Sequence, residues 1–63
     1  MIPKKIVENL VNNDVYIYIK NMTKEFAGKI TSITEADLVV LEDKNENLVY
    51  IPISEISVIT ERR

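Results

Sequence analysis

The chain has 63 residues, enough for one domain, and a domain of this size buries only roughly 60% of the surface that its unfolded chain exposes. It has no cysteine and no histidine. Disulfides are therefore excluded, the usual ligands of a structural zinc site are missing, and association between copies is the remaining route to added stability. The net charge of −2 excludes a strongly basic protein whose affinity for nucleic acid rests on many phosphate contacts.

The first predicted element is a helix over residues 3–12. Pro3 suits the first helical position, where a missing N–H has no consequence, and Asn12 can end the helix because Asn tolerates the left-handed conformation. Four apolar residues fall on one side of this helix: Ile6, Val7, Leu10 and Val11. A helix of about ten residues is not stable alone in water, so we expect this apolar side to pack on the rest of the chain.

Five strands joined by short turns follow the helix, and we expect them over residues 15–20, 26–33, 38–43, 48–53 and 56–60. In the first strand, Val15, Ile17 and Ile19 alternate with Tyr16 and Tyr18, which predicts that the tyrosines point away from the core. In the second strand we expect Phe26 in the core, and Gly28 indicates a bulge or a sharp bend.

Short turns make consecutive strands antiparallel neighbours. The link at residues 52–55 is too short for such pairing and contains Pro52, so we expect the fifth strand to cross to the far edge, beside the first. The fold class is therefore mainly β: a short N-terminal helix and a five-stranded, strongly bent antiparallel open barrel. One domain covers residues 1–63, with the barrel at 14–61.

The fourth and fifth strands are then the two open edges of the sheet, and open edges are hazards unless they are used. Both edges are rich in apolar residues. Pairing the fourth strand of one copy with the fifth strand of the next is a heterologous contact, which closes a ring when rotation repeats it. The residues that we expect at this subunit interface are Leu48, Tyr50, Ile53, Ile56 and Val58.

Two stretches carry a resemblance to a known family. VYIYIKN at residues 15–21 is followed by Gly28, Lys29 and Ile30, and LVYIPI at residues 48–53 is followed by Ile56. This pattern, after a helix, resembles the Sm/LSm family. The short turn at 44–47 and the Val-Tyr pair in the fourth strand are similar to the bacterial Hfq type.

The resemblance implies an Hfq-like, homo-oligomeric ring, with a hexamer favoured over a heptamer, that binds U-rich or A-rich single-stranded RNA and helps RNAs pair in post-transcriptional regulation. It also implies two RNA-binding surfaces. The set at the pore, on the helix face, is Lys4, Lys5, Glu35, Ala36, Asp37, Ile51 and Pro52. The set on the opposite face is Tyr18, Lys20, Asn21 and Met22, where Tyr18 matches the tyrosine that stacks purine bases in Hfq.

Simpler interpretations stay open for both surfaces. Lys4 and Lys5 can be a solvated helix face, and Tyr16 and Tyr18 can be cross-strand packing residues. Met22 stands where the family has its turn glycine, and the corner around Pro52 lacks the family's charged groups. The alternative function is therefore a ring-forming interaction scaffold with little or no RNA binding.

Enzymatic function is not expected, because the chain has no histidine, cysteine or Gly-rich phosphate loop. We likewise expect no catalytic residues, no metal site and no cofactor. No apolar run approaches the roughly 20 residues of a membrane helix, which predicts a cytoplasmic protein without a membrane partner.

Overall fold

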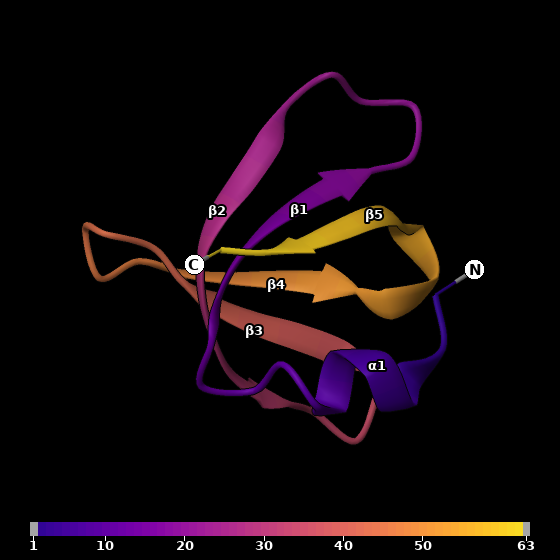
Figure 1. Cartoon of the computed structure of the whole chain (residues 1–63), viewed down its shortest axis with the longest axis horizontal. Helices are drawn as coiled ribbons and strands as arrows, with labels where there is room; N and C mark the ends of the chain where they lie inside the picture. The colour runs from indigo at the N-terminus through magenta and orange to yellow at the C-terminus, as the bar shows by residue number, and fades with distance from the viewer. Residues whose placement is uncertain (1, 63) are drawn as a thin grey trace.

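The computed structural model describes residues 2–62, so the two terminal residues of the predicted domain lie outside it. A short helix is followed by five strands, with one 3-10 turn between the last two (Figure 1). The elements are α1 (Lys4–Glu8), β1 (Asp14–Ile19), β2 (Glu25–Ile33), β3 (Leu38–Glu42), β4 (Leu48–Pro52), η1 (Ile53–Glu55) and β5 (Ile56–Glu61). Within residues 2–62, the structure has no helix of the length and apolarity that crossing a membrane requires.

The helix is shorter than the predicted 3–12, because α1 ends at Glu8. The chain then needs its backbone groups for β2: the N–H of Asn12 donates to the carbonyl of Ile30 at 2.6 Å, and the carbonyl of Asn13 accepts from the N–H of Ile30 at 3.2 Å. Asn12 adopts the left-handed conformation, with φ of 76°, but it does not end the helix as predicted, because the C-cap of α1 is Asn9. Ile6, expected on the packed side, is 49% exposed.

The five strands form one antiparallel sheet in the order β4-β3-β2-β1-β5. The prediction that the fifth strand crosses to pair with the first is confirmed, with Tyr18 opposite Val58 and Ile17 opposite Ile59. Within this sheet β4 and β5 each have a neighbour on one side, so they are the predicted open edges. The strong bending that we expected of the barrel stays a prediction.

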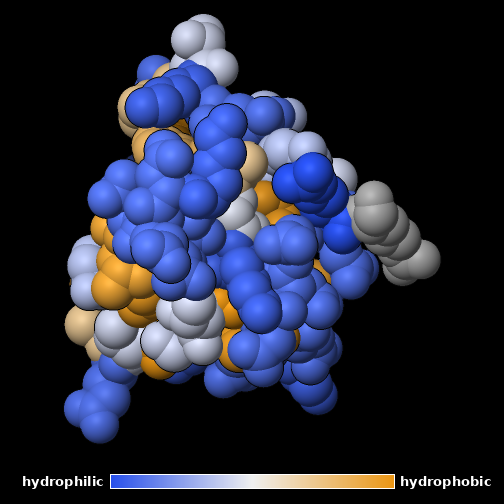
Figure 2. All heavy atoms as spheres, turned by 90° about the vertical axis from the view of Figure 1, so that its left-hand side faces the viewer, coloured by the Kyte–Doolittle hydropathy of each residue, from blue (hydrophilic) through white to orange (hydrophobic). Residues whose placement is uncertain are grey.

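The core lies on the inward side of the sheet and includes Val7 of α1, and strand alternation explains which strand side chains reach it. Val15 and Ile17 of β1 are fully buried, whereas Tyr16 and Tyr18 are half-buried on the outer side. Phe26 is half-buried and packs against the core. The side of the molecule that carries the β3–β4 turn is mostly hydrophilic, with small apolar areas between the polar side chains (Figure 2). The fully or nearly fully buried core comprises Val7, Val15, Ile17, Ile30, Val39, Leu41, Ile51, Ile53 and Ile56.

The corner after β4 is held by backbone hydrogen bonds on both sides. Pro52 is the last residue of β4 and lies opposite Leu38. Because β4 is an edge strand, it tolerates a residue that has no N–H to donate to the ladder. The next N–H, that of Ile53, donates to the carbonyl of Asp37 at 3.0 Å, and the carbonyl of Glu55 accepts from Lys20 at 2.9 Å. Because η1 is tied to the β2–β3 turn and to the end of β1, the chain is directed from one edge of the sheet to the other.

Gly28 is required by a close backbone approach. The expected bulge lies elsewhere, since the β2–β3 register shifts between Ile30 and Ser32, while Gly28 pairs regularly with Val15. A Cβ on Gly28 would lie 2.5 Å from the carbonyl oxygen of Glu42 and 3.1 Å from Cγ of Leu41. The first contact is with backbone, so it cannot be relieved by a side-chain rotation.

We therefore predict that Gly28→Ala destabilises the fold by roughly 1–3 kcal/mol, the usual range for overpacking. Where the backbone has room, Gly→Ala instead stabilises a protein by about 0.4–1 kcal/mol, so the sign of the change is diagnostic. Urea denaturation gives the free energy of unfolding, and Ser32→Ala, an exposed position on the same strand, serves as the control with a change within about 0.5 kcal/mol. A stabilised Gly28→Ala variant would contradict the close approach.

Candidate functional site

The structure brings four of the predicted helix-face residues together. Lys4 at the start of α1, Ala36 and Asp37 in the β2–β3 turn, and Pro52 at the end of β4 line one cavity of about 340 Å³. Ile2, Pro3, Ile53 and Ser54 complete its walls. The hydrogen bond between Ile53 and Asp37 joins η1 to the β2–β3 turn, and an ion pair between Lys4 and Asp37 joins the start of α1 to the same turn.

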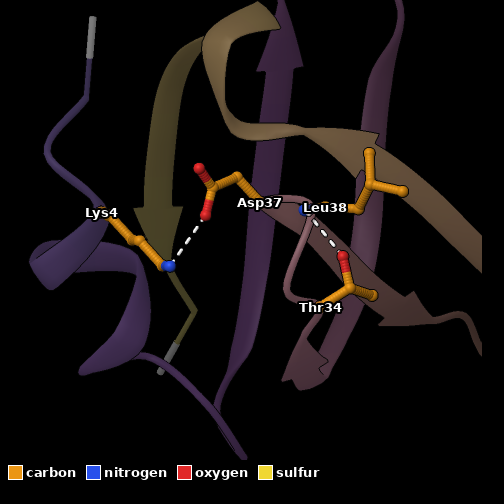
Figure 3. Close-up of polar contacts among 4 residues, drawn as sticks. All are labelled: Lys4, Thr34, Asp37 and Leu38. Carbon is orange, nitrogen blue, oxygen red and sulfur yellow. Dashed lines mark hydrogen bonds and ion pairs between the residues drawn. The ribbon is translucent and has the colours of Figure 1, made fainter.

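The β2–β3 turn presents Asp37 to the helix. The N–H of Leu38 donates to Oγ1 of Thr34 at 3.1 Å, and the N–H of Thr34 donates to the carbonyl of Leu38 at 2.9 Å. Asp37 has a φ of 61°, a left-handed conformation that Asp and Asn adopt more readily than most residues. Figure 3 shows the resulting arrangement, in which the carboxylate of Asp37 points toward the amino group of Lys4.

Lys4 and Asp37 form an ion pair, with 2.7 Å between Nζ and Oδ1. The hydrogen bond to the carboxylate, followed by its negative charge, raises the pKa of Lys4 above the ordinary value. The two side chains are 48% and 60% exposed, and exposed ion pairs contribute little to stability. The main consequence is electrostatic, because the cation expected to meet a phosphate here is already paired with an anion.

The other three predicted helix-face residues lie apart from this cavity. Lys5 and Glu35 are exposed to solvent and are not among its lining residues. Ile51 is 3% exposed and belongs to the core, so its side chain is not available on this surface, contrary to the expectation. Position 51 is on the inward side of β4 because Tyr50 and Pro52, on either side of it, point outward.

The second predicted surface lies at the end of β1 and the turn after it. Lys20, Asn21 and Met22 are exposed there. Asn21 adopts the left-handed conformation with φ of 61°, and the N–H of Met22 donates to the carbonyl of Ile19 at 3.2 Å. The left-handed position is therefore occupied by Asn, which tolerates it, and Met22 can replace a glycine in this turn without left-handed strain.

Tyr18 is held in place by a residue that sequence reasoning missed. Its hydroxyl donates to Oε2 of Glu25 at 2.5 Å, and the two residues are opposite each other in the β1–β2 ladder. This hydrogen bond, more than burial or charge, raises the pKa of Tyr18 above its ordinary value. Counting back from the turn along both strands is the one sequence signal that could have paired them.

The predicted interface residues divide into two groups. Leu48, Tyr50 and Val58 are 51%, 56% and 49% exposed, so their side chains are available at the two edges. Ile53 and Ile56 are 5% and 1% exposed, so their side chains belong to the core and not to the exposed edges that the prediction assumed. Ile53 is the buried residue of η1.

The chain matches no model of a protein family and no curated protein. Its fold is similar to the crystal structure of an Sm-like protein from Archaeoglobus fulgidus, with a TM-score of 0.70 and 15% sequence identity over 98% of this chain and 96% of that chain. The fold is therefore Sm-like over nearly the whole length of both proteins.

The contact between Tyr18 and Glu25 predicts a pH dependence. Tyr18 ionises above the ordinary pKa of 10.0, and Glu25→Gln should bring this pKa back toward 10 because the charged acceptor is lost. Since the folded pKa is raised, the contact stabilises the fold fully below pH 10 and is lost as the pH rises through the folded pKa.

Tyrosine ionisation can be followed by NMR of the ring carbon that bears the hydroxyl, which resolves Tyr18 from Tyr16 and Tyr50. Glu46→Gln, which removes the same charge from the exposed β3–β4 turn, is the control and should leave the Tyr18 titration unchanged. A Tyr18 pKa that is equal in the native protein and in Glu25→Gln would show that the hydrogen bond is not formed in solution.

Proposed function

We propose that the chain assembles edge to edge into a homo-oligomeric ring, six copies favoured over seven, that binds single-stranded RNA in the manner of Hfq-like Sm proteins. The observation that carries the proposal is the pair of open, apolar edge strands on an Sm-like fold. The protein would act by binding alone, in the cytoplasm, without cofactor or catalysis.

The edges support assembly because β4 and β5 each pair with one strand of the sheet and carry exposed apolar side chains. Leu48 and Tyr50 both lie on the outer side of β4, two residues apart. Val58 lies on the outer side of β5, opposite Tyr18. Pairing β4 of one copy with β5 of the next would satisfy both backbones and bury these side chains together. The contact uses two different surfaces, so repetition by rotation closes a ring.

For RNA, the face that carries Tyr18 is the stronger candidate. Tyr18 is fixed by Glu25 and lies beside Lys20, which together offer a stacking surface and a cation. Base stacking on an aromatic ring contributes about 1–3 kcal/mol per base, and a ring repeats this contribution in each copy. On the helix side the Lys4 charge is paired with Asp37, which weakens that surface for phosphate. We therefore propose A-rich RNA as the preferred ligand over U-rich RNA.

A second candidate function is a ring-forming scaffold with little RNA binding. It is favoured by the net charge of −2 and by the ion pair that neutralises Lys4. Labelled A-rich and U-rich oligonucleotides titrated with protein at moderate salt separate the two functions. Binding of the A-rich strand supports the ring that binds RNA, and no binding of either strand at tens of micromolar protein supports the scaffold.

Tyr18→Ala is predicted to weaken the binding of A-rich RNA by about 5- to 150-fold for each stacking contact that is lost. Tyr18→Phe retains the aromatic ring and loses the hydroxyl, so its affinity for A-rich RNA should be within about threefold of that of the native protein. Fluorescence polarisation measures both affinities, and sizing confirms that the assembly is intact. Unchanged binding by Tyr18→Ala would assign Tyr18 to cross-strand packing.

Val58→Lys is predicted to dissociate the ring, because it would bury an unpaired charge at the edge contact. Ser32→Lys introduces the same side chain at an exposed position on β2, an inner strand of the sheet, and should leave the assembly intact. Size-exclusion chromatography with light scattering gives the mass of each variant. An oligomer that persists in Val58→Lys would place the subunit contact elsewhere.

A further inference from the structure

A groove of about 570 Å³ lies on the outer side of the sheet, and it shares no lining residue with the cavity on the helix side. Tyr16 lines it from β1, Ala27, Gly28 and Lys29 line it from β2, and Arg62 lines it beyond the end of β5. The β3–β4 turn closes the other side. Figure 2 views the side of the molecule that carries this turn.

The groove is open because the aromatic ring of Tyr16 has small neighbours. Its partner on β2 is Ala27, and its partner on β5 is Thr60. Neither side chain is large enough to cover a tyrosine ring, and the next residue on β2 is Gly28. The guanidinium of Arg62 lies near the ring, with its central carbon 5.9 Å from the ring centroid.

Three cations and three carboxylates line the groove. Asp14 and Glu42 flank Lys29 in register on the neighbouring strands. Oδ1 of Asp43 accepts the backbone N–H groups of Asn45 and Asn47, both at 2.9 Å. Arg62 lies beside the Tyr16 ring, and Lys44 lines the groove from the β3–β4 turn.

We propose that this groove binds one nucleotide of single-stranded RNA, with the base stacked on Tyr16 beside Arg62 and the phosphate held by Arg62 and Lys44. An aromatic face next to a guanidinium can bind any base, because stacking does not depend on which base is present. The inference rests on the proposed RNA-binding function and adds a second stacking position to each subunit.

Position on the sheet makes the groove a continuation of the surface around Tyr18. Tyr16 and Tyr18 are two residues apart on the same side of β1, which places them about 7 Å apart along the strand. One RNA strand can therefore reach both rings. None of the predicted interface residues lines the groove, so the proposed subunit contact through Leu48, Tyr50 and Val58 does not require it to be covered.

The experiment compares variants that remove either the aromatic ring of Tyr16 or the positive charge of Arg62. Tyr16→Leu removes the aromatic face but keeps an apolar side chain, and it should weaken the binding of A-rich RNA by about 5- to 150-fold for each stacking contact that is lost. Tyr16→Phe keeps the face and should bind within about threefold of the native protein. Arg62→Gln should weaken binding more than Lys24→Gln, because Lys24 carries the same charge outside the groove, over the ring of Phe26. Circular dichroism and sizing confirm that each variant is folded and assembled.

Adenosine monophosphate titrated into the native protein is the second measurement, followed by amide chemical shifts in NMR. Shifts concentrated at Tyr16, Ala27, Gly28 and Lys44 support the groove as a nucleotide site. A short oligoglutamate serves as the comparison ligand. If it shifts the same amides as strongly, the groove is a general cationic patch for acidic chains and the proposal is overturned.

Failure of this inference and failure of the proposed function give different results. If Tyr18→Ala has a lower affinity for RNA but Tyr16→Leu and Arg62→Gln have the affinity of the native protein, the groove proposal is overturned and the proposed RNA binding stands. If the native protein binds no RNA, the proposed function fails. The adenosine monophosphate titration then decides the groove alone: localised shifts support it, and their absence at millimolar nucleotide overturns it.

Discussion

The structure depends on one constraint, the backbone hydrogen bonds that hold the corner between β4 and β5. The N–H of Ile53 is bound by Asp37, and the carbonyl of Glu55 is bound by Lys20, so the chain leaves β4 at one edge of the sheet and begins β5 at the other. Pro52 is compatible with this path because an edge strand needs fewer N–H donors. The two edges left open by this crossing are the basis of the proposed ring.

The same corner organises the surface charge. It sets the β2–β3 turn against the start of α1, where Asp37 pairs with Lys4 and removes a free cation from the helix side. The aromatic residues of the outer side, Tyr16 and Tyr18, lie on β1, the strand that β5 joins after the crossing. In the proposed assembly, RNA is therefore bound mainly by stacking on the face opposite the helix, and less by charge at the helix side.

Much of this fold could be predicted from local sequence. Strand alternation placed Val15 and Ile17 inside and the tyrosines outside, and the short link around Pro52 indicated the crossing to β1. The early end of α1 could not be predicted, because it results from hydrogen bonds between Asn12, Asn13 and Ile30 that form only in the tertiary fold. The sequence did not show that Ile51, Ile53 and Ile56 are buried. Apolar residues in an edge strand or a 3-10 turn can belong either to the core or to an interface, and composition does not distinguish the two. The partners Glu25 and Asp37 depend on cross-strand register and on turn geometry, which composition does not encode.

The central claim is that the two open edges of the sheet pair between copies and close a ring. Native mass spectrometry of the unmodified protein at micromolar concentration tests this most directly, because it counts the chains in each assembly. We predict a single dominant species at six or seven times the chain mass of 7.3 kDa, without a ladder of intermediate sizes, since a closed ring leaves no free edge. A dominant monomer, or an open series of dimers, trimers and longer chains, would contradict the account.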